Sequence, residues 1–179
     1  MTRRQPWPWI ILFVWGAWIH ALLGRASAGG LLGGFTPDLG LVLLLAVEPR
    51  LPARHARRAA LLVALSRAAF SAEPPLAIAA AMLAVVTLWR ALGDFVEVDG
   101  ALARGAVAGA LSLFSGTLLA LVHAARLDPG LVGAGVPFPA GAVLRTAAAT
   151  GLCAVLVGPL LARLPGLSPF THVERRAFA

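Results

Sequence analysis

The sequence predicts an all-α, polytopic membrane protein with about six transmembrane helices packed in one bundle. Hydrophobic residues make up 59% of the 179 residues and charged residues only 13%, whereas a soluble domain has about 25% charged residues. The apolar residues form long runs that approach the roughly 20 residues needed to cross the hydrocarbon core. Because only short polar connections separate these runs, residues 1–179 are expected to form a single membrane domain.

The first span is expected at residues 7–23, after the basic pair Arg3 and Arg4. Its four tryptophans fall mostly towards the ends of the run, where aromatic rings anchor helices at the membrane interface: Trp7, Trp9, Trp15 and Trp18. An alternative is a secretory signal peptide, since Ala26-Ser27-Ala28 has the small-x-small pattern of a cleavage site. The run is longer and more aromatic than a usual signal core, which favours the span.

The second span is expected at residues 31–48, and its first residues belong to a glycine-rich stretch over residues 24–35. Thr36-Pro37-Asp38 indicates a helix start, with threonine as the cap, proline at the first position and aspartate in the first turn. The helix from there to Glu48 would be about 18 Å long, too short to cross alone. Either the glycine-rich residues extend it, or residues 31–35 form a re-entrant piece packed against protein.

Four further spans follow, separated by polar or turn-rich segments. The stretch 49–58 is expected to be a basic cytoplasmic loop, and Ser71 to Pro75 should end the third span. The expected spans are residues 59–70, 76–92, 104–124 and 140–164.

The arginines predict the orientation, since cytoplasmic segments of membrane proteins carry an excess of basic residues. With the N-terminus inside, two arginines lie outside, Arg25 and Arg126, and eleven lie on the cytoplasmic side. Both termini are therefore expected in the cytoplasm, in a bacterial inner membrane. The eleven are Arg3, Arg4, Arg50, Arg54, Arg57, Arg58, Arg90, Arg104, Arg163, Arg175 and Arg176.

Six polar residues are expected near the outer ends of their helices, and intramembrane charges each need a physical reason. One hypothesis is a shared polar network or partner-binding site. The alternative is that Arg67 and Arg145 extend to outer phosphates and that Asp38 serves only its own helix start. The six are His20, Asp38, Arg67, Glu73, His123 and Arg145.

In the fifth span, Gly105, Gly109, Ser112 and Gly116 share one face at helical spacing. Small faces let helix backbones approach closely, and internal packing is favoured here over contact with a separate protein. No nucleophile–base pair, phosphate-binding loop or metal-ligand spacing is present, and Cys153 is a single cysteine in an apolar run. The sequence therefore predicts no enzyme, no cofactor, no metal site and no nucleic-acid partner.

The order of these features resembles the bacterial rod shape-determining MreD family. The resemblance lies in Thr36-Pro37-Asp38-Leu39, in Glu48-Pro49-Arg50, in the polar turn of residues 67–75, and in Pro159 before Leu160-Leu161-Ala162-Arg163. The third span departs from the family, which commonly has an acid near its outer end where this chain has Ser66 and Arg67.

The resemblance implies a non-enzymatic scaffold of the cell-wall elongation complex. Its partners would be the transmembrane helices of an MreC-like protein and of a peptidoglycan synthase, a glycosyltransferase with its transpeptidase. The alternative function is the membrane subunit that captures a vitamin or metal for a transporter. A capture subunit should have a polar pocket open to the outside, whereas a scaffold should have a small-residue or apolar groove sized for a helix.

Overall fold

The computed structural model describes residues 7–28, 35–48, 51–93, 100–127, 139–161 and 163–167, and every regular element in them is a helix. The expected all-α membrane protein is confirmed. Three described helices are long and apolar enough to cross a membrane: α1 (Trp7–Ala28), α4 (Pro75–Gly93) and α5 (Ala101–Leu127). A fourth, α6 (Ala140–Leu156), is apolar but shorter.

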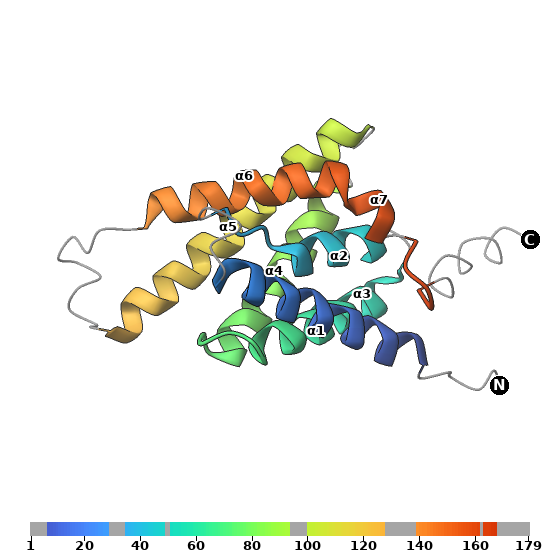
Figure 1. Ribbon diagram of the computed structural model, residues 1–179, viewed down its shortest axis with the longest axis horizontal. Coiled ribbons are helices and arrows are strands. Elements are labelled where there is room, and N and C mark those ends of the chain that lie inside the picture. Colours follow the sequence, from blue (N-terminus) through green and yellow to red (C-terminus); the bar gives the residue numbers. More distant parts are fainter. Residues whose placement is uncertain are drawn as a thin grey trace, which may run out of the picture.

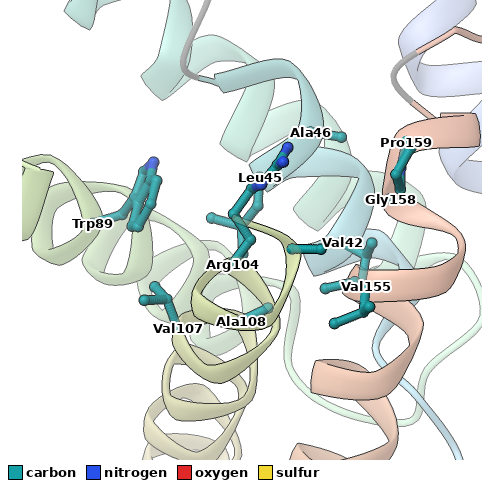
Figure 2. Close-up of a pocket in the computed structure, with 12 residues that line it drawn as sticks. Val42, Leu45, Ala46, Trp89, Arg104, Val107, Ala108, Val155, Gly158 and Pro159 are labelled. Carbon is teal, nitrogen blue, oxygen red and sulfur yellow. The ribbon is translucent and has the colours of Figure 1, made fainter. Parts of the chain in front are cut away.

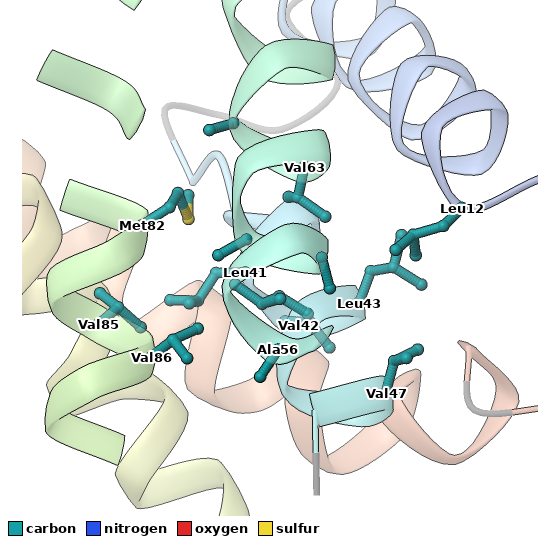
Figure 3. Packing of buried hydrophobic residues seen from close by; sticks show 14 of the residues in the cluster. Leu12, Leu41, Val42, Leu43, Val47, Ala56, Val63, Met82, Val85 and Val86 are labelled. Carbon is teal, nitrogen blue, oxygen red and sulfur yellow. The ribbon is translucent and has the colours of Figure 1, made fainter. Parts of the chain in front are cut away.

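The short helix α2 (Leu39–Val47) lies at the centre of the bundle (Figure 1). It contacts α1, α3 (Ala53–Ala68), α5, α6 and the single-turn helix α7 (Gly158–Leu161). Six of its nine residues are buried. Figure 3 shows Leu41, Val42 and Leu43 of α2 in one buried cluster with Val63 of α3 and Val86 of α4. A helix without a polar face needs such all-round burial or lipid contact.

The predicted second span is wrong in its extent. Residues 35–38 are not helical, so no helix extends from Leu39 back through Phe35. Asp38 is the N-cap, and its carboxylate accepts a hydrogen bond from the Leu41 N–H at 2.9 Å, so the cap is Asp38 and not Thr36. Nine residues span only about 13 Å, and α2 therefore does not cross the membrane. Residues 31–34, which the re-entrant hypothesis concerned, lie outside the described residues.

Two other boundaries differ from the sequence prediction. Helix α3 begins at Ala53, so Arg54, Arg57 and Arg58 are helical rather than in a loop, and they remain exposed. Alanine and arginine are both strong helix formers, which explains this early start. The last span is interrupted after α6, because Pro159 has no N–H to bond back to Val155. The Val157 carbonyl instead accepts the N–H groups of Leu160 and Leu161.

From α1 to α6, successive helices alternate in direction (Figure 1). The starts of α1 and α3 lie together, where the rings of Trp9 and His55 meet edge to face at 5.6 Å. We call the two ends of the bundle after the residues that flank α2: the Asp38 end and the Glu48 end. Near the last described residues, the Pro165 carbonyl accepts the Trp15 indole N–H at 3.2 Å, so this segment packs against α1.

Candidate functional site

A polar recess of about 300 Å³ opens at the Asp38 end, between α1, the start of α2, the end of α3 and α6. We call it the Asp38 recess. Its polar side chains come from four separate segments of the chain, so only the folded bundle brings them together. Its lining residues with polar side chains are His20, Thr36, Asp38, Arg67, Ser71 and Thr146.

An ion pair between Asp38 and Arg67 forms the charged part of this recess. One Asp38 oxygen caps α2 and the other accepts the Arg67 guanidinium, so the carboxylate is bonded on both oxygens. The Asp38 side chain is 7% exposed and that of Arg67 is 23% exposed. Because the pair is neutral as a whole, both charges can be held at this depth at far lower cost than either alone.

His20 lies beside this pair and has an unsatisfied polar atom. Its Nε2 is buried and has no hydrogen-bond partner among the described residues. The imidazole packs over α2, since a Cβ at Gly40 would lie 2.6 Å from His20 Nε2. Only glycine at position 40 leaves room for the ring so close to the helix.

Thr150 of α6 joins three helices next to the recess. Its Oγ1 accepts the Asp38 N–H at 2.8 Å and the Ser112 hydroxyl at 3.1 Å, and it donates to the Thr146 carbonyl at 2.7 Å. Thr150 is fully buried and Ser112 almost so. This hydroxyl therefore fixes the start of α2 against both α5 and α6.

A second ion pair holds the other end of α2. Glu48, 2% exposed, pairs with Arg90 of α4, which also donates to the Leu51 carbonyl. The ten residue steps from Asp38 to Glu48 place the two pairs about 15 Å apart along the helix, half the thickness of the hydrocarbon core. Each end of the buried helix therefore has its own acid and its own arginine.

The other three residues of the predicted polar network do not join the Asp38 recess. His123 and Arg145 are exposed on α5 and α6. The Arg145 side chain points back towards the start of its own helix, since its Nη1 is 3.8 Å from a Cβ built at Gly141. This is the direction expected of an arginine that extends to the membrane interface. Glu73 is half-buried in the α3–α4 connection, and its Oε2 is buried without a partner among the described residues.

The predicted small-residue face lies at the contact between α5 and α6. A Cβ at Gly105 would be 2.9 Å from the Gly151 carbonyl oxygen, and one at Gly109 would be 3.2 Å from the Ala147 carbonyl oxygen. Gly116 faces Val143 at 3.1 Å, and Ser112 faces Thr150. These residues let the two helices pack backbone to backbone.

The same close contact creates a shallow groove of about 500 Å³ along the outside of the pair. We call it the hairpin groove. Gly109, Ala110, Ala148 and other small residues form its floor, and four leucines line it. On each helix the groove covers 11 residue steps, or about 16 Å. The leucines are Leu102, Leu113, Leu144 and Leu152, all exposed.

Three residues of these networks were not predicted from the sequence: Glu48, Arg90 and Thr150. Thr146 and Thr150 are four residues apart on one helix face, which is the one signal that pointed to a polar position in this span. No protein-family model matches this chain, and neither a curated protein nor a solved structure does.

Proposed function

We propose that this chain is a non-enzymatic scaffold of the bacterial inner membrane that binds the transmembrane helix of a partner in its hairpin groove. The observation that carries this proposal is the groove itself: a floor of glycine and alanine, three helical turns long, with leucines along it. Helices in lipid associate through close van der Waals packing, for which small residues are the main requirement. The exposed alanines of this floor, Ala106, Ala110 and Ala148, offer a third helix a close contact of the kind that α5 and α6 make with each other.

The polar groups of the bundle support a scaffold as well. The buried charges form two ion pairs, Asp38 with Arg67 and Glu48 with Arg90. The Thr150 hydroxyl accepts the Asp38 N–H and so joins α6 to the start of α2. These contacts hold α2 against α3, α4, α5 and α6. Together with the resemblance to the MreD family, this makes an MreC-like protein and the peptidoglycan synthase of the elongation complex the proposed partners.

The test compares two alanines that are both exposed. Ala148→Phe fills the groove floor, whereas Ala80→Phe makes the same change on α4, outside the groove. Overfilling a close contact typically costs about 1–3 kcal/mol, so co-purification of a co-expressed MreC-like protein should fall about tenfold for Ala148→Phe only. Equal recovery with both variants, each with a normal melting temperature, would refute the groove as the binding surface.

The proposal also places both termini and the Glu48 end in the cytoplasm. Cysteine at exposed Ala53, in a Cys153→Ala background, should resist an impermeant thiol reagent in intact cells, whereas cysteine at exposed Ala125 should react. The reverse pattern would invert the orientation.

Capture of a small molecule is the second candidate function, and the Asp38 recess favours it. A pocket with several convergent polar groups is typical of a ligand site, and the unpaired His20 Nε2 adds an unsatisfied atom next to it. Ser71→Trp would fill this recess without touching the hairpin groove. A capture subunit should then lose uptake of its substrate, whereas a scaffold should keep its partner.

A further inference from the structure

Another pocket, of about 220 Å³, opens at the Glu48 end of the bundle. It is enclosed by α2, α4, α5 and the segment where α6 ends and α7 begins. We call it the Arg104 pocket. Its walls are mostly apolar, formed by Val42, Leu45, Val107, Val155 and neighbouring alanines. Gly158 and Pro159 line it where the last span is interrupted. The interruption therefore leaves space that a continuous helix with larger side chains would fill.

Two of the side chains that line this pocket carry polar tips. Figure 2 shows the Arg104 side chain between Trp89 and Val42, with its nitrogen atoms towards Leu45 and Ala46. The indole nitrogen of Trp89 points the same way. Tryptophan and arginine side chains with an apolar body and a polar tip are typical of the level of the lipid headgroups.

The charge at this position is positive and accessible. Arg104 is exposed, and its Nε donates only to the Gly100 carbonyl at 3.3 Å, one turn back on its own helix. The described residues show no carboxylate in an ion pair with it. The end of α2, with its partial negative charge, lies beside the guanidinium and favours its position there. The Nη groups can therefore donate to an anionic ligand.

We propose that the Arg104 pocket binds one anionic phospholipid, with an acyl chain against the apolar walls and the headgroup phosphate on Arg104. Water would fill the cavity poorly, because its walls offer few hydrogen-bond partners. An acyl chain instead gains about 0.8 kcal/mol for each buried methylene group. Basic pockets between transmembrane helices on the cytoplasmic side are known to bind anionic headgroups. The site differs from the hairpin groove and does not depend on a protein partner.

The test is native mass spectrometry of the purified full chain with equal amounts of phosphatidylglycerol and phosphatidylcholine that have identical acyl chains. One phosphatidylglycerol should be retained in preference to phosphatidylcholine. Arg104→Gln should reduce this preference about fivefold, the factor that about 1 kcal/mol per interfacial arginine implies. Arg54→Gln, which removes an exposed arginine at the same end of the bundle, should have no such effect.

Two further measurements separate a lipid from its headgroup alone. Ala101→Phe, at the exposed mouth of the pocket, should reduce retention of both lipids because it obstructs the acyl chain. Millimolar inorganic phosphate should not displace the lipid. Unchanged preference in Arg104→Gln would overturn the proposal, and displacement by phosphate alone would show a site for free anions without an acyl chain.

Discussion

Gly151→Ala and Gly24→Ala make the same chemical change in two helix interiors, and their effects on stability should differ. A Cβ at Gly151 would lie 2.8 Å from the Gly105 carbonyl oxygen and 3.5 Å from the Gly109 Cα. A Cβ at Gly24 meets no atom within 4 Å. The atoms that Gly151→Ala would contact belong to the backbone, so they cannot move aside without separating α5 from α6.

The magnitude follows from two terms, of which one is shared. Replacing a mid-helix glycine by alanine favours the helix by about 0.5–1 kcal/mol at either position. Overpacking at position 151 costs about 1–3 kcal/mol in addition. Gly24→Ala should therefore stabilise the protein by about 0.5–1 kcal/mol, and Gly151→Ala should be less stable than Gly24→Ala by about 1–3 kcal/mol.

The assay is unfolding of the purified protein in mild detergent by titration with sodium dodecyl sulfate, followed by tryptophan fluorescence. The chain has five tryptophans, and three of them, Trp9 and Trp15 of α1 and Trp89 of α4, are half-buried against the core. Equal stabilisation by both variants would show that α5 and α6 are further apart than described. In that case the hairpin groove, which depends on the same contact, would also lose its basis.

Arg67→Leu leaves the buried Asp38 carboxylate without its partner and should destabilise the protein by about 2 kcal/mol. This is less than the roughly 3–5 kcal/mol lost when a fully buried pair is broken, because 23% of the Arg67 side chain is exposed. Arg145→Leu, which removes an exposed arginine, is the control, and equal melting temperatures for the two would contradict the ion pair. Thr150→Val removes the acceptor of two donors and should cost about 1–3 kcal/mol. Thr117→Val removes a hydroxyl that bonds only to the Leu113 carbonyl of its own helix, and it should leave the melting temperature nearly unchanged.

The sequence predicted the helices well where a single physical signal decided them. Long apolar runs located α1, α4 and α5, since lipid requires a helix of a certain length. Pro74 and Pro75 correctly indicated the start of α4. The boundaries failed where local signals competed: the arginines near Ala53 indicated a loop by charge but a helix by propensity, and propensity determined the structure.

The candidate site was only partly predictable because its contacts join distant segments. Asp38 and Arg67 were each identified as charges that need a reason, but their 29-residue separation gives no pattern that pairs them. Glu48 and Arg90 were missed because each was expected at a polar helix end, where a charge needs no partner. Thr150 was missed because a threonine inside an apolar span gains its role only when three helices meet at its hydroxyl.

The shortness of α2 accounts for the two hollows at its ends. A helix of about 13 Å in a hydrocarbon layer of about 30 Å leaves more than half of that thickness without it. At its first residues the unfilled space is the Asp38 recess, and at its last residues it is the Arg104 pocket. The charges follow from the same cause, because the free N–H and C=O groups at the two ends of a buried helix need partners that lipid cannot supply. Asp38 caps one end, and the Leu51 carbonyl just beyond the other end accepts Arg90, so the polar residues stand where the fold requires them.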